Sequence, residues 1–281
     1  ADPYRLGLAQ EDLQAASVRL LAFAAVAAIQ IMLVVDIKRL VRSTLSKSSE
    51  RANLARFFSP GTAELLASRG LGVGLARHEA AVMFLDIRGF TSLAEKMPLE
   101  EVASLLSDFR YRVVAMVSEY GGTIDKFIGD GVMVVFGFPA SSQQDTANAF
   151  DCSQQLIQQL DAWSDRRVGS GEAALSFGIG LHHGSVIGGV IAAGAHNECT
   201  VLGDAVNLAS RLQAMCRSLD ADIVMSRAMA ERLHEHRLDE RWTVKSRARI
   251  PGRTGMSDVV YLPSSRARPA VPEMAGRGKV S

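Results

Sequence analysis

The stretch from Thr123 to Phe138, "TIDKFIGDGVMVVFGF", constrains the fold more than any other part of the chain. Two apolar runs flank Gly129-Asp130-Gly131, and this pattern predicts a β-hairpin with Asp130 at its tip. Elsewhere between residues 77 and 263 the predicted strands and helices alternate. A hairpin that interrupts this alternation favours a mixed α+β sandwich over a doubly wound parallel sheet.

Local patterns predict the remaining elements of this region. A helix begins after Pro98 and ends at Gly121-Gly122, and a second helix covers residues 145–163. Residues 200–216 indicate the end of a strand, a turn and a helix. Further strands are predicted at 80–87, 175–184, 186–194, 221–226 and 257–263, and one helical turn at 227–233.

An apolar segment at residues 13–35 predicts a transmembrane helix, with Arg19 as its only charge. A buried core helix and a signal peptide are the alternatives, although acidic residues precede the run, unlike in a signal peptide. By the positive-inside rule, the basic residues that follow the run predict that everything downstream lies in the cytoplasm. Around this helix we expect an N-terminal remnant at 1–12, a signalling helix or solvated linker at 36–76, and a disordered tail at 264–281.

Composition excludes several classes of protein. The net charge of +1 gives no reason to expect a nucleic-acid partner. Three scattered cysteines indicate neither a disulfide framework nor a zinc site, and we expect them to be reduced in a cytosolic compartment.

His182 and His183 are adjacent on a predicted strand and therefore point to opposite faces, so we interpret them as structural residues.

Two acidic residues, Asp86 and Asp130, stand beside apolar runs that are far apart in the chain. Asp86 follows "AAVMFL", and Asp130 lies at the hairpin tip 44 positions later. If the two strands are neighbours, both carboxylates emerge at one edge of the sheet, where they repel each other unless cations lie between them. Oxygen ligands favour Mg²⁺ or Mn²⁺, and a pair of such ions suits in-line attack at phosphorus. The alternative is ordinary turn chemistry, because aspartate beside glycine is common in hairpins.

Three segments carry a family resemblance: "FLDIRGFTSLAEK", "GGTIDKFIGDGVMVVFG" and "TVLGDAVNLASRLQ". Together they resemble the signature segments of the class III nucleotidyl cyclases, and the resemblance covers most of residues 77–263. It implies an α/β sandwich with an antiparallel-rich, ferredoxin-like or palm-like sheet. It also implies conversion of a nucleoside triphosphate to its 3′,5′-cyclic monophosphate and pyrophosphate, in sites at a homodimer interface.

The resemblance also implies roles for the metal and phosphate residues. Asp86 and Asp130 would bind two Mg²⁺ (or Mn²⁺), with the backbone carbonyl of Ile87 as a further ligand. The turn that contains Phe90 and Thr91 opens a short helix, whose amides could hold the triphosphate.

Lys126 and Thr200 occupy the two base-reading positions of the family. A lysine at this place can donate to an adenine ring nitrogen, whereas a guanine-selective enzyme would carry an acceptor, so Lys126 favours ATP. Thr200 departs from the aspartate of many adenylate cyclases and resembles a subgroup that includes bicarbonate-responsive cyclases. Because a hydroxyl both donates and accepts, Thr200 alone does not exclude guanine.

Asn207 and Arg211 lie four residues apart on one helix and therefore share a face. They resemble the pair that orients the ribose and stabilises charge on the α-phosphate, and Arg253 aligns with a basic residue that reaches the terminal phosphates. In the family the metal aspartates come from one subunit and these residues from the other, so we expect a homodimer. The sequence thus predicts a membrane-anchored adenylate cyclase, with a guanylate cyclase or an inactive nucleotide-binding regulator as alternatives.

Overall fold

The computed structural model describes residues 75–193, 196–233 and 238–264. The predicted transmembrane helix at 13–35, nearly all of the linker and nearly all of the predicted tail lie outside these ranges. Among the helices within these ranges, none combines the length and the apolar character needed to cross a bilayer.

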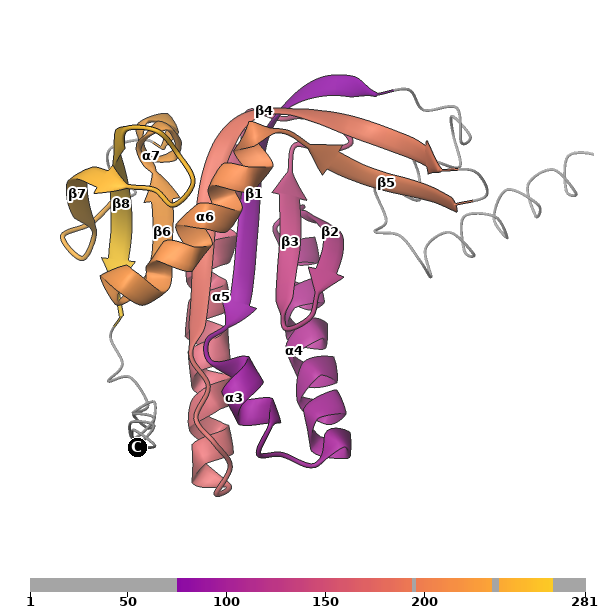
Figure 1. The fold of residues 1–281 in the computed structure, drawn as a ribbon, viewed down its shortest axis with the longest axis vertical. Helices are drawn as coiled ribbons and strands as arrows, with labels where there is room; N and C mark the ends of the chain where they lie inside the picture. The colour runs from indigo at the N-terminus through magenta and orange to yellow at the C-terminus, as the bar shows by residue number, and fades with distance from the viewer. Residues whose placement is uncertain (1–74, 194–195, 234–237, 265–281) are drawn as a thin grey trace, which may run out of the picture. The chain divides into compact units, whose positions relative to one another are not determined.

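The described residues form an eight-stranded sheet in the order β2-β3-β1-β4-β6-β8-β7, with β5 paired to β4 beside this path (Figure 1). Only β4 and β6 are parallel, and every other pairing is antiparallel. The predicted α+β fold with an antiparallel-rich mixed sheet is therefore confirmed. The strands are β1 (Ala76–Ile87), β2 (Thr123–Ile128), β3 (Gly131–Phe136), β4 (Phe177–Ala193), β5 (His196–Leu202), β6 (Ala221–Ser226), β7 (Thr243–Arg249) and β8 (Met256–Pro263).

The central strand β1 separates two layers of side chains because alternate residues of a strand face opposite sides. Met83 and Leu85 belong to the main core under α4 (Leu99–Glu119) and α5 (Asp145–Gly169), whereas Ala80 and Val82 face the other side with residues of α6 (Asp204–Leu219). Figure 1 shows α4 and α5 behind the sheet and α6 crossing in front of it. Two short helices, α3 (Phe90–Ala94) and α7 (Arg227–Arg232), complete the fold.

A glycine lets α6 approach the sheet closely. A Cβ built on Gly180 of β4 would lie 2.7 Å from the Cα of Gln213 and closer still to two other backbone atoms of α6. No side chain fits there, so the absence of one at position 180 determines how deeply this helix lies on the sheet. Since α6 carries Asn207 and Arg211, this contact also positions two predicted site residues.

Three elements differ from the sequence-based prediction. The two strands predicted at 175–184 and 186–194 are one continuous strand, because β1 pairs with β4 from Phe177 to Gly188 and β5 pairs with the rest. Helix α5 continues to Gly169, and near its end the Ser164 hydroxyl donates to the Leu175 carbonyl (2.9 Å) and accepts from its N–H (2.8 Å). Strand β7 was not predicted, because its polar sequence is mostly exposed and lacks the apolar pattern of a buried strand.

Candidate active site

Asp86 and Asp130 lie at one edge of the sheet. Strands β1 and β3 are antiparallel neighbours with Leu85 opposite Val132, so the next step along this register sets Asp86 beside Gly131. A Cβ built on Gly131 would lie only 3.6 Å from the Cβ of Asp86, which shows how little space separates the two strands here. After burial, the negative charge of Asp130 is the next cause that raises the pKa of Asp86, as expected for two neighbouring carboxylates.

The carboxylate of Asp86 has an unfavourable electrostatic environment. Burial is the largest cause that raises its pKa, from the usual 3.8 to about 6; Asp130 adds to the rise, and a hydrogen bond from Gln213 and the charge of Arg88 oppose it. The Oδ1 atom of Asp86 is buried and has no hydrogen-bond partner among the described residues. An unpartnered anionic oxygen beside a second carboxylate fits a divalent cation.

The described part of the chain contains no group of three or more His, Cys, Asp or Glu side chains that could hold a metal ion. Two carboxylates are nevertheless a suitable donor set for Mg²⁺, which usually binds one or two carboxylates together with substrate phosphates. Ile87 ends β1 directly after Asp86, so its carbonyl belongs to the same edge. The Arg88 guanidinium points to β6, where it donates to the Ala221 carbonyl and lies 3.6 Å from Asp222 Oδ1.

Asp86, Ile87 and Asp130 form an edge that we call the metal edge after its predicted role. Phe90 and Thr91 open the helix α3, which follows the metal edge. Gly89 precedes them in the left-handed conformation (φ 69°), and no side chain caps the helix. Phe90 is partly buried against the main core, whereas Thr91 is exposed. The first amides of α3 therefore have no side-chain cap, and they follow Asp86 closely in the chain.

Lys126 and Thr200 come together around a residue that sequence reasoning missed, Asp125. Thr200 Oγ1 donates to Asp125 Oδ2 (2.9 Å), the Val201 N–H donates to Asp125 Oδ1 (3.3 Å), and Lys126 Nζ lies 3.6 Å from Asp125 Oδ2. Lys126 also donates to Glu198 of β5. Burial raises the pKa of Asp125, against the opposing effects of Thr200, Lys126 and Val201. One sequence signal could have identified Asp125: it forms a polar pair with Lys126 within an otherwise apolar hairpin strand.

Asn207 and Arg211 lie on the first half of α6, Asn207 exposed and Arg211 partly buried. The Arg211 guanidinium lies against the backbone of Gly252, where a Cβ would be 3.2 Å from its Nη2. The neighbouring Arg253 pairs with Asp204 at the start of α6. The loop before β8 therefore contacts the helix face that carries Arg211.

His182 and His183 face opposite sides of β4, as predicted. His182 Nδ1 lies 2.7 Å from Ser226 Oγ, and burial is the main cause that lowers its pKa to about 4. Burial also lowers the pKa of His183, whose charged neighbours include Arg232 and Glu79. Both imidazoles are therefore neutral near pH 7, which agrees with a structural role.

The predicted site residues form three groups within one chain: the metal edge, the Lys126–Thr200 pair, and the α6 face with Arg253. Within the described ranges, no hydrogen bond or ion pair joins Asp86 to Lys126, Thr200 or Arg211. Even-numbered residues of β1, which include Asp86, face away from α4 and α5. Phe127 packs on the main core, so the preceding Lys126 lies on the other face of β2. The first two groups thus share one face of the sheet.

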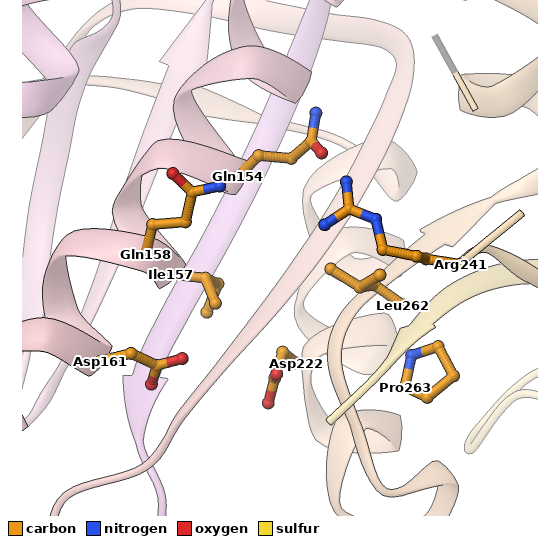
Figure 2. Close-up of a pocket in the computed structure, with 8 residues that line it drawn as sticks. All are labelled: Gln154, Ile157, Gln158, Asp161, Asp222, Arg241, Leu262 and Pro263. Atoms are coloured by element: carbon orange, nitrogen blue, oxygen red, sulfur yellow. The ribbon is translucent and has the colours of Figure 1, made fainter. Parts of the chain in front are cut away.

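A pocket of about 340 Å³ lies elsewhere, between α5 and the strands β6 and β8. Figure 2 shows Gln154, Gln158 and Asp161 on the helix, with Arg241 and Leu262 across from them. None of the predicted site residues lines it. Asp222, which lines this pocket, is the ion-pair partner of Arg88.

Comparison with known proteins identifies relatives of most of the described region. The family profile described as "Adenylate and Guanylate cyclase catalytic domain" matches residues 76–262. An adenylate cyclase of Anabaena cylindrica is 33% identical over 156 residues, which are 54% of this chain and 30% of that protein. The chain spans less than a third of the length of the curated relatives it matches.

Two solved structures resemble the fold and the sequence. The adenylyl cyclase CyaB from P. aeruginosa superposes with a TM-score of 0.62 at 27% identity, over 69% of this chain and 97% of that one. The guanylyl cyclase Cya2 superposes with a TM-score of 0.59 at 28% identity, over 67% of this chain and 92% of that one. The two relatives act on different bases by name, so overall similarity does not decide between them.

Proposed function

Because the chain belongs to the family of class III adenylate and guanylate cyclase catalytic domains, we propose that it converts ATP to 3′,5′-cyclic AMP and pyrophosphate. The observation that carries the proposal is the buried, unpartnered Asp86 oxygen beside the charge of Asp130. A carboxylate pair of this kind is costly in a fold unless a cation compensates for it. Its presence supports a catalytic rather than a purely regulatory domain.

In this proposal Asp86, Asp130 and the Ile87 carbonyl hold the divalent ions, and the turn at Phe90 and Thr91 receives the phosphates. Two bound Mg²⁺ would make the ribose 3′-hydroxyl more acidic and neutralise the leaving pyrophosphate. Burial suits this role, since charge interactions are stronger where water is excluded. Gln213 donates to the Asp86 carboxylate and fixes its orientation.

Lys126 reads the base and Asn207 with Arg211 acts on the ribose and α-phosphate. Lysine donates only, so it matches the unprotonated ring nitrogen of adenine and conflicts with the N–H of guanine. Arg211 provides a planar fork of donors that stays charged, which suits a phosphate whose negative charge grows in the transition state. Arg253 would leave Asp204 to reach the terminal phosphates; this exposed ion pair contributes little and opens readily.

We propose that two copies of the chain share each site, with the metal edge of one facing the base-reading residues and α6 of the other. The test mixes Asp86→Ala chains with Arg211→Ala chains, each inactive alone. Random exchange of subunits leaves one intact site in half of the dimers, so about one quarter of wild-type activity should return. A mixture that stays inactive after verified subunit exchange would refute the shared site.

We also propose that residues 13–35 anchor the enzyme in a membrane with the catalytic domain in the cytoplasm. The support is the apolar sequence and the basic residues that follow it. The segment at 36–76 would then set the relative placement of the two catalytic domains. Sedimentation of the full chain with lipid vesicles tests the anchor, and activity that is unchanged after deletion of residues 1–60 would contradict control by this segment.

One assay tests the activity itself. The purified full chain is incubated with ATP or GTP and with Mg²⁺ or Mn²⁺, and both cyclic products are measured. We expect cyclic AMP to exceed cyclic GMP and Asp86→Ala to abolish both. Predominant cyclic GMP would support the guanylate cyclase alternative, to which the similarity to Cya2 and the ambivalent hydroxyl of Thr200 point. Nucleotide binding without either product would indicate a regulatory domain instead.

A further inference from the structure

Asp125 is a buried carboxylate for which the proposed reaction has no direct use. Its side chain is only 3% exposed, although it lies next to Lys126, whose side chain is 36% exposed. Burying a charged group costs free energy unless hydrogen bonds and opposite charges compensate. Asp125 has both kinds of compensation: hydrogen bonds from Thr200 and Val201, and the positive charge of Lys126. Each of these partners is, or adjoins, a predicted base-reading position.

A β-bulge explains how two consecutive residues reach the same cluster. On a regular strand Asp125 and Lys126 would point to opposite faces. The pairing of β2 with β3 shifts by one residue here, from Ile124 opposite Val134 to Lys126 opposite Met133, which leaves Asp125 as the extra residue. Bulges re-aim side chains in this way and occur often beside active sites. The bulge thus delivers the Asp125 carboxylate to β5, where Thr200 lies.

The hydrogen bonds of Asp125 fix the direction in which the Thr200 hydroxyl is used. The Val201 N–H donates to Oδ1, and the Lys126 ammonium lies 3.6 Å from Oδ2, so both oxygens are held as acceptors. The Thr200 hydroxyl donates its only proton to Oδ2. Since a hydroxyl has one proton and two lone pairs, Thr200 can then offer a base nothing but lone pairs.

We propose that Asp125 is the positioning residue that makes this site select adenine, because it commits the Thr200 hydroxyl to act as an acceptor. The exocyclic group at position 6 is an amino donor in adenine and a carbonyl acceptor in guanine. An acceptor-only Thr200 matches the first and opposes the second. The inference rests on the proposed cyclase function, and it resolves the ambiguity that threonine at position 200 leaves open.

Glu198 holds the Lys126 ammonium beside this acceptor. Thr200 is only 2% exposed, and Lys126 beside it is bound to Glu198, whose side chain is 52% exposed. A base that takes the Lys126 ammonium therefore displaces Glu198 first. Exposed ion pairs are weak, so this exchange costs little, and Asp125 keeps Thr200 oriented while Lys126 moves.

Asp125→Asn is the decisive substitution, because it keeps the shape and exchanges one acceptor for a donor. The amide oxygen can accept from the Val201 N–H, and the NH₂ group then donates to Thr200 Oγ1. The threonine proton is released toward the base and becomes a donor that matches guanine. We expect the ratio of kcat/KM for ATP to kcat/KM for GTP to fall by about 10- to 100-fold, the usual effect of mispairing one buried hydrogen bond.

Two further variants separate this effect from a loss of structure. Thr200→Val removes the hydroxyl, so adding Asp125→Asn to it should no longer change the ATP-to-GTP ratio. Asp125→Ala leaves the hydroxyl free to rotate, so the ratio should fall in the same direction, and this variant replaces Asp125→Asn if the amide impairs folding. Asp108→Asn, which removes an exposed carboxylate on α4, is the control and should leave the ratio unchanged.

The outcomes distinguish this inference from the proposed function. If the wild-type full chain makes neither cyclic product, the proposed function fails. If it makes cyclic AMP but Asp125→Asn and Asp125→Ala leave the ratio unchanged, or shift it equally in the Thr200→Val background, only the role of Asp125 is overturned. Equilibrium binding of non-hydrolysable ATP and GTP analogues should show the same change of preference, which a merely structural loss would not produce.

Discussion

Replacing Asp86 with asparagine should abolish activity and yet make the metal-free protein more stable at pH 7. The pKa of Asp86 is raised from 3.8 to about 6 in the folded chain, mainly by burial and then by Asp130. At 1.36 kcal/mol per pKa unit, ionised Asp86 lowers the free energy of unfolding by about 3 kcal/mol. An asparagine side chain cannot ionise, so the Asp86→Asn variant avoids this cost.

The metal-free wild-type chain loses stability as the pH rises, because ionisation of buried Asp86 opposes folding. Because the folded pKa lies above the unfolded one, the neutral form favours folding, and this stability is fully present below pH 3.8. It is lost as the pH rises through about 6. With a chelator present, wild type should therefore lose stability relative to Asp86→Asn between about pH 4 and pH 7, and added Mg²⁺ should stabilise wild type alone.

Urea unfolding measures this difference through the intrinsic fluorescence of the two tryptophans, Trp163 and Trp242, which both pack in the main core. Unfolding curves are compared at pH 4.5 and pH 7 for wild type, Asp86→Asn and the exposed control Asp108→Asn. The control should follow wild type at both values. An Asp86→Asn variant that is no more stable than wild type at pH 7 without metal would refute the electrostatic reasoning.

Two other substitutions test contacts that support the site. Gly180→Ala would push α6 off β4, so we expect it to lower the free energy of unfolding by about 3 kcal/mol and to remove most of kcat. The control Gly169→Ala, with open space at its Cβ, should be neutral in unfolding and activity assays. Equal behaviour of the two variants would contradict the close approach of α6 to β4. Glu198→Gln should lower KM for ATP by about two- to fivefold at unchanged kcat, because it removes the ion pair that occupies Lys126. Steady-state kinetics measures this. An unchanged KM would show that the ion pair does not compete with substrate.

Sequence reasoning worked where a local pattern has one physical meaning. The apolar runs around Gly129 and Gly131 predicted the hairpin of β2 and β3. Asp130 lies beside Asp86 because β3 of this hairpin pairs with β1, as the metal hypothesis assumed. It failed where partners far along the chain decide the conformation. Two strands were predicted at 175–184 and 186–194, yet β4 is one strand because β1 and β5 pair with it.

Side-chain chemistry and the spacing of apolar residues are local properties, so they were enough to predict the family, the class of fold and the types of residue in the candidate site. The hydrogen-bond direction of the Thr200 hydroxyl depends instead on a tertiary contact. Its partner is Asp125, 75 residues earlier, which a one-residue bulge brings to β5. A hydroxyl takes its direction from whichever group packs against it, so only the folded chain shows whether Thr200 donates or accepts.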